Sequence, residues 1–151
     1  MPRTRWQHLV VTAVVAGLLS YAVLSMLLMR GLSPIPVPGT MWAGLAVVAV
    51  AVLLLGRSVR RFTERKPTRM DALRAARVAV LAKASSAAGA ALAGYFAAHV
   101  LAALANLGAP MLTTHAWWAG AAGLASLALV VVGLVVESWC RIPPDDDEAH
   151  A

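Results

Sequence analysis

GRSVRRFTERKPTRMDALRAARVAVLAK, residues 56–83, decides the fold of this chain, because it carries nine of the thirteen Lys and Arg residues. Two apolar halves of similar size flank it. Loops on the cytoplasmic side of membrane proteins hold an excess of Lys and Arg. The stretch therefore predicts a basic cytoplasmic connector, residues 57–83, between two membrane-embedded halves.

The composition places the chain among membrane proteins. Hydrophobic residues make up 60% of its 151 residues and charged residues 13%, against about 25% charged in soluble domains. We expect a single membrane domain over residues 1–151. The net charge of +6 comes from bases that flank apolar spans and are not interleaved with exposed aromatic residues. This pattern favours the lipid bilayer and its anionic headgroups as partners and excludes nucleic acid.

Four apolar segments are long enough to cross the bilayer as helices. The breaks between them are marked by prolines, at 34, 36 and 38, at 67, and at 110. Alternating prolines favour a stiff, extended link after the first span. The sequence therefore predicts an all-α membrane protein, an antiparallel bundle of four transmembrane helices with spans at residues 9–29, 39–56, 84–105 and 116–136.

The distribution of basic residues predicts the orientation. The N-terminal residues, the basic connector and the C-terminal residues hold twelve of the thirteen bases, and the other two loops hold only Arg30. Both termini are therefore expected in the cytoplasm, with the protein in the plasma (inner) membrane and an acidic cytoplasmic tail at residues 141–151. Tryptophans near the span ends are expected to be interface anchors: Trp6, Trp42, Trp117, Trp118 and Trp139.

Lys83 and Glu137 lie at the cytoplasmic edges of the third and fourth spans. Each shares a helical face with small residues, Gly94 among those of Lys83 and Gly133 among those of Glu137. Small-residue faces are where transmembrane helices approach closely. The sequence predicts that the third and fourth helices pack antiparallel and that Lys83 and Glu137 form an ion pair. A structural clamp is the favoured interpretation, and an ion or proton relay is the alternative.

The arginines and lysine of the basic connector suit a membrane surface or an acidic partner. Their simplest role is to hold the connector inside the cell. In addition, they are expected to bind anionic lipid headgroups, a soluble acidic partner or the acidic tail of the same chain. These candidate binding residues are Arg57, Arg60, Arg61, Arg65, Lys66, Arg69, Arg74 and Arg77.

No motif for catalysis, cofactor binding or metal binding is found. His99 and His115 fall near the same membrane side, but no third ligand with metal-like spacing accompanies them. The single cysteine, Cys140, permits no intramolecular disulfide and is expected to be a small packed thiol. The protein is expected to have no enzymatic activity.

Four stretches resemble a family of small actinobacterial membrane proteins, catalogued as domain of unknown function 3180. They are Arg3–Arg5, Gly56–Arg61, Leu73–Ala84 and Val135–Asp145. The resemblance implies four helices and a gene often placed beside folate-biosynthesis genes, and it implies no activity. The resemblance strengthens the case that seven residues within these stretches have a role: Arg74, Arg77, Lys83, Glu137, Trp139, Cys140 and Arg141.

We therefore expect a non-enzymatic accessory or scaffold subunit. Its membrane-protein partner, or a second copy of the chain, would bind through the small-residue faces or the basic connector. The alternative is a small oligomeric transporter or channel-like protein, in which Lys83 and Glu137 gate the cytoplasmic mouth.

Overall fold

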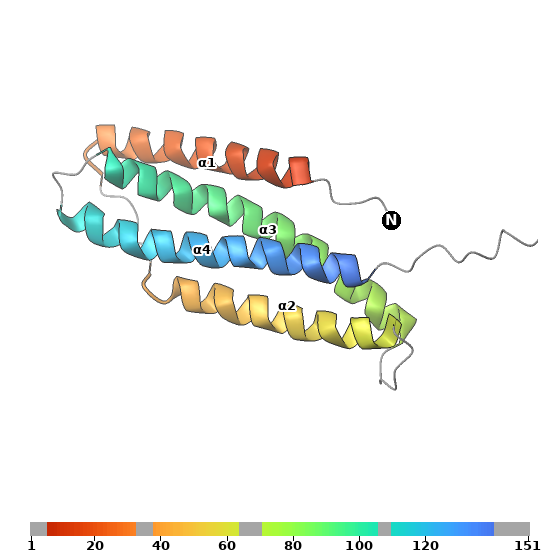
Figure 1. Cartoon of the computed structure of the whole chain (residues 1–151). Helices are drawn as coiled ribbons and strands as arrows, with labels where there is room; N and C mark the ends of the chain where they lie inside the picture. Colours follow the sequence, from red (N-terminus) through yellow and green to blue (C-terminus); the bar gives the residue numbers. More distant parts are fainter. Residues whose placement is uncertain (1–5, 33–37, 64–70, 106–109, 141–151) are drawn as a thin grey trace, which may run out of the picture.

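The computed structural model describes residues 6–32, 38–63, 71–105 and 110–140, and these form four helices (Figure 1). They are α1 (Trp6–Met29), α2 (Met41–Thr63), α3 (Ala72–Leu104) and α4 (Pro110–Trp139). All four are long and apolar enough to cross a membrane. The predicted all-α fold of four transmembrane helices is confirmed, and the chain is a multi-pass membrane protein.

Consecutive helices run in opposite directions, but α1 and α2, which follow one another in the sequence, do not lie side by side (Figure 1). The helices lie in the order α1, α3, α4, α2, and α2 makes a smaller contact with α3. Within the described residues, α1 contacts α3 alone. The helix pairs α1–α3 and α2–α4 are therefore parallel, whereas the central pair α3–α4 is antiparallel, as predicted.

The separation of α1 from α2 requires a long connection. Four helix axes in a row, each about 8–10 Å from the next, would place α1 and α2 at most roughly 24–30 Å apart. Residues 30–41, fully extended, can span about 36 Å. An extended link, as the alternating prolines predict, has the reach to join the two outer helices. Residues 33–37 of this link lie outside the described residues.

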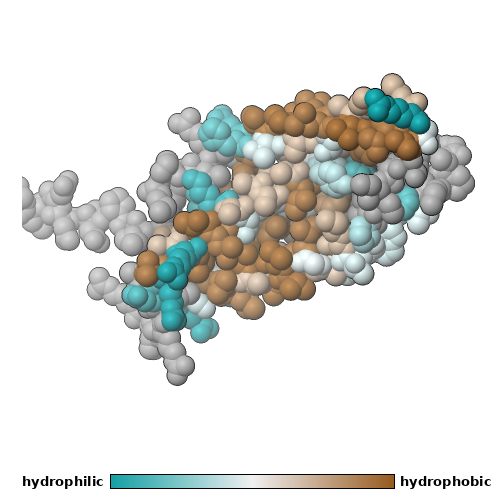
Figure 2. All heavy atoms as spheres, turned by 180° about the vertical axis from the view of Figure 1, so that it is seen from behind, coloured by the Kyte–Doolittle hydropathy of each residue, from teal (hydrophilic) through white to brown (hydrophobic). Residues whose placement is uncertain are grey.

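The helices are longer than the predicted spans, because both sides of the basic connector are helical. α2 continues past Gly56 to Thr63, and α3 begins at Ala72. The carbonyl of Asp71 accepts a hydrogen bond from the Ala75 amide at 3.0 Å, and this bond starts α3. Figure 2 shows hydrophobic side chains over the middle of the helices and hydrophilic ones gathered towards the ends. Residues 57–63 and 72–83 of the connector are thus helical extensions of α2 and α3.

Candidate functional site

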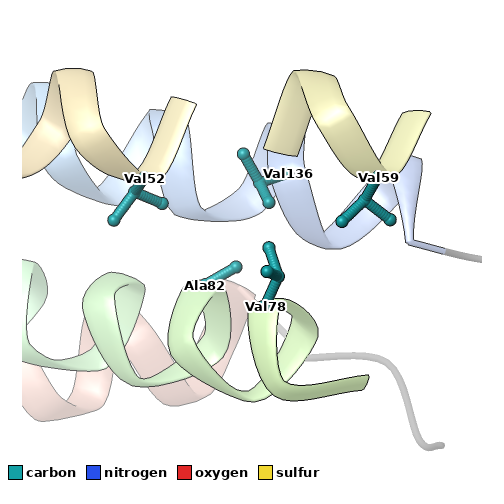
Figure 3. Packing of buried hydrophobic residues seen from close by; sticks show 5 residues of the cluster. All are labelled: Val52, Val59, Val78, Ala82 and Val136. Carbon is teal, nitrogen blue, oxygen red and sulfur yellow. The ribbon is translucent and has the colours of Figure 1, made fainter. Parts of the chain in front are cut away.

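The helical extensions are held together by a hydrophobic cluster, here called the end core (Figure 3). Val59 of α2 and Val136 of α4 are almost completely buried, and Val78 of α3 packs between them. The full cluster is Val52, Val59, Val78, Ala82 and Val136, with Ala75, Val132, Trp139 and Cys140 packed against it. Three helices therefore converge at one end, the end where α2 finishes and α3 begins.

Gly56 lets α2 approach α4 at this core. A Cβ atom added at Gly56 would overlap both methyl groups of Val136. Since Val136 is fully buried and β-branched, it has little freedom to move aside. The pairing of Gly56 with Val136 was not predicted. The spacing of Val52, Gly56 and Val59 marks an inward face of α2, but it does not say which helix that face meets.

The side chain of Arg60 lies over the ring of Trp139. The guanidinium carbon of Arg60 lies 5.4 Å from the centroid of the Trp139 ring, within the range of a cation–π interaction. Trp139 and Cys140 also contact the end core. The Trp139-Cys140 stretch, whose role the sequence leaves unexplained, is therefore the point where α4 supports the basic end of α2. The predicted anchor role of Trp139 becomes in part a packing role.

Five exposed arginines project from these supported helix ends. We call them the arginine platform: Arg57, Arg60 and Arg61 on α2, and Arg74 and Arg77 on α3. Both helices carry these residues on regular backbone, so their relative positions are fixed by the end core. The other candidates, Arg65, Lys66 and Arg69, lie outside the described residues.

Lys83 and Glu137 lie in different surroundings. Lys83 is exposed, whereas Glu137 is half-buried and its Oε2 atom is enclosed. Gly94, which shares the face of Lys83, packs on Ala13 and Gly17 of α1 and not on α4. At Gly94, α3 therefore presents a small residue to α1, whereas at Gly89 it presents one to α4. The ion pair itself stays a prediction.

The face of α4 that carries Glu137 does pack closely on α3. A Cβ added at Gly133 would lie 2.8 Å from the Ala82 carbonyl oxygen and 2.9 Å from the Ser86 Cβ. Farther along, Gly89 of α3 approaches the Ser126 carbonyl oxygen, at 3.0 Å from an added Cβ. The predicted close approach of helices at small residues is confirmed, and most of these residues are used within the chain.

An apolar groove of about 860 Å³ remains between α1, α3 and α4. Its lining includes Gly17, Ala97 and Gly120, one from each helix. Gly120 differs from the packed glycines because an added Cβ would meet no atom within 4 Å. The groove lining is almost entirely apolar, and the Tyr21 hydroxyl is the polar side-chain group among the lining residues.

The hydroxyl groups within the spans bond to their own helices. Ser126 donates to the Ala122 carbonyl at 2.8 Å and Ser86 to the Lys83 carbonyl at 2.9 Å. His99 donates from Nδ1 to the Tyr95 carbonyl at 3.1 Å, and its ring tilts against the Tyr95 ring at 4.4 Å. Such bonds satisfy polar side chains without a partner from another helix.

Of the remaining tryptophans, Trp6 and Trp42 lie at helix starts, whereas Trp117 and Trp118 lie about two turns into α4. Trp6 begins α1, and Trp42 lies one residue into α2. Trp117 is 82% exposed, whereas the Trp118 ring approaches Gly39 just before α2. Their role as membrane anchors stays a prediction.

The reactivity of the Cys140 thiol, which packs against the end core, tests the effect of the nearby Glu137 charge. Burial, and to a smaller extent the negative charge of Glu137, raise the pKa of Cys140 above its usual value. Thiolate is the reactive form, so a raised pKa slows alkylation near neutral pH. We expect Glu137→Gln to lower the pKa and to speed iodoacetamide alkylation at pH 8 about two- to fivefold, since one pKa unit changes the thiolate fraction up to tenfold.

The control for this measurement is the same pair of proteins unfolded in SDS, where both should react equally fast. Equal rates in the folded proteins would show that Glu137 does not act on Cys140.

A family comparison matches almost the whole chain. A model of the family described as "Protein of unknown function (DUF3180)" matches residues 9–144, which include all of the end core and the arginine platform. No curated protein and no solved structure matches the chain. The match covers well over half of the sequence and agrees with the stretches that resemble this family. The chain therefore belongs to the DUF3180 family of proteins of unknown function.

Proposed function

We propose that this protein is a non-enzymatic accessory protein of the plasma (inner) membrane, with both termini in the cytoplasm. Its arginine platform binds an acidic face of a partner protein. The observation that carries the proposal is the rigid projection of five exposed arginines from two helix ends joined by the end core.

The distance of the platform arginines from the ends of the apolar spans favours a protein partner over lipid. Lys83 and Gly56 mark the ends of the apolar spans, and on α3 Arg77 and Arg74 lie about 9 Å and about 14 Å beyond Lys83 at 1.5 Å per residue. The headgroup layer is only roughly 5–7 Å thick on each side of the hydrocarbon. The arginines of α3 therefore lie above the headgroups, whereas Arg57 and Lys83 lie among them.

The lower bases have a separate role in this proposal. Arg57 and Lys83 anchor the protein on anionic headgroups, with about 1 kcal/mol from each base near the surface. Arg61, Arg74 and Arg77 lie farther from the spans and bind an acidic surface of a soluble or membrane-bound protein. A planar guanidinium suits this role because it forms paired hydrogen bonds with a carboxylate. The helical extensions thus divide one run of bases into an anchor and a docking surface.

The packing of the glycines also points to the platform. Neighbouring helices of the same chain already occupy the space beside Gly94 and Gly133. A partner helix therefore cannot use those faces without displacing α1 or α3. Apart from the apolar groove beside Gly120, the predicted docking surface that is left exposed is the basic one along both helix ends.

The test is purification of the tagged protein from its own membrane in gentle detergent, with mass spectrometry of the proteins that accompany it. We expect one partner at near-equal amount. The variant Arg61→Gln/Arg74→Gln/Arg77→Gln should retain about a tenth of that partner or less, because charge-assisted hydrogen bonds contribute about 1.5–3 kcal/mol each. Arg30→Gln, at the other end of the bundle, is the matched control and should retain all of it.

Two results would count against the proposal. Equal recovery of the partner with both variants would place the interface elsewhere. A homo-oligomer with bound lipid and no second protein would favour the alternative, a small transporter with Lys83 and Glu137 at its cytoplasmic mouth. The half-buried carboxylate of Glu137 is the observation in favour of that alternative.

A further inference from the structure

We propose that the arginine platform also binds an acidic segment of its own chain, Asp145–Glu148, which competes with the partner. The contact itself does not depend on the proposed function, whereas its regulatory role rests on it. The segment lies in residues 141–151, outside the described part of the chain, so the argument starts from the residues that precede it.

The structure fixes the point from which this segment starts. α4 ends at Trp139, and the Arg60 guanidinium lies over the Trp139 ring, 5.4 Å from its centroid. Cys140 is packed against the end core. The chain therefore leaves α4 directly beside the platform and not at a distant edge of the bundle.

The tether between the two is short. Four residues lie between Cys140 and Asp145, so five Cα–Cα steps give a reach of about 17 Å when extended. Packed helices lie about 8–10 Å apart, so the arginines of α2, which packs on α4, fall within this reach. A short tether holds the two groups at a high effective concentration, which suffices for a weak ionic contact.

The charges of the two groups are complementary. Four of the seven acidic residues of the chain lie at 145–148, and the platform carries five exposed arginines. The DDDE sequence presents to these arginines the same chemistry that an acidic partner would present. Occupation by this segment therefore blocks weak or incorrect partners, and a cognate partner must displace it.

Carbodiimide crosslinking tests the contact without a partner. Arg61→Lys keeps the charge and places an amine on the platform, and the reagent joins an amine to a carboxylate only where the two are in contact, with loss of one water. In neutral-lipid nanodiscs that hold one copy, we expect an intramolecular link from residue 61 to residues 145–148. Its yield should fall at least about fivefold between roughly 0.05 M and 0.5 M salt, as ionic contacts are screened.

The matched control is Arg30→Lys, which places the same amine at the opposite end of the bundle and should give no such link. The absence of a link from residue 61, or equal links from residues 30 and 61, would overturn the contact.

A second measurement tests the regulatory role. The variant Asp145→Asn/Asp146→Asn/Asp147→Asn/Glu148→Gln should recover about three times more partner than the parent, or more, in the purification described above. A link without this increase would overturn regulation while leaving the contact. Failure to recover any partner from either protein would instead overturn the proposed function, and the crosslink would be unaffected.

Discussion

Gly94→Leu is expected to detach α1 from the rest of the bundle. The Cβ of any larger residue at position 94 would overlap the Ala13 carbonyl oxygen, and the Gly17 amide nitrogen would lie within 2.9 Å of it. These are backbone atoms, so no side-chain rotation relieves the overlap. Overpacking of this kind costs about 1–3 kcal/mol, and occasionally more. Because α1 contacts α3 alone among the described helices, it has no second attachment.

A site-specific crosslink measures this outcome. Leu24 of α1 clusters with Ala98 and Ala102 of α3. A Leu24→Cys/Ala98→Cys pair, in a Cys140→Ser background, should be joined by a short thiol crosslinker in the parent and not after Gly94→Leu. We also expect earlier unfolding with increasing SDS.

Gly120→Leu is the matched control for Gly94→Leu. It introduces the same side chain one helix away, where an added Cβ meets no atom within 4 Å. Replacing a helical glycine also gains about 0.8–1 kcal/mol of helix propensity. Gly120→Leu should therefore crosslink as well as the parent and unfold no earlier. If Gly94→Leu behaved in the same way, the close approach of α1 and α3 would be wrong.

The sequence predicted much of this fold because single helices have strong local signals. Length and hydropathy marked four spans, and a helix of the structure corresponds to each of them. The order of the helices in space was not predicted. It depends on which small-residue face meets which helix, and Gly94 and Gly133 look alike in sequence although one meets α1 and the other meets α3.

The sequence predicted the charged residues of the candidate site but not the tertiary contacts that hold them in place. Arg57 and Arg77 were recognisable as surface or partner-binding bases from their type and position. The helical extension that carries Arg77 is supported by the burial of Val59 and Val78 against Val136, which requires a tertiary contact. Likewise, the ring of Trp139 beneath Arg60 joins residues far apart in the sequence.

The second large effect is expected at the junction of α2 and α4, where Gly56→Ala should destabilise the end core. An added methyl group would overlap the side chain of Val136, which is fully buried. We expect a loss of about 1–3 kcal/mol in unfolding free energy, measured by SDS titration with tryptophan fluorescence. Because the arginine platform rests on this core, Gly56→Ala should also reduce recovery of the partner.

A size exchange distinguishes this specific contact from a general defect of α2. Val136→Ala alone leaves a cavity and should also destabilise the protein, by about 1–2 kcal/mol. Together with Gly56→Ala, it removes the two methyl groups that the new one would overlap. The double variant should therefore be more stable than the sum of the single effects predicts, by at least about 1 kcal/mol, which is the coupling expected of residues in direct contact. Additive effects would mean that Gly56 and Val136 do not meet, and the platform would then lack the support from which its rigidity is inferred.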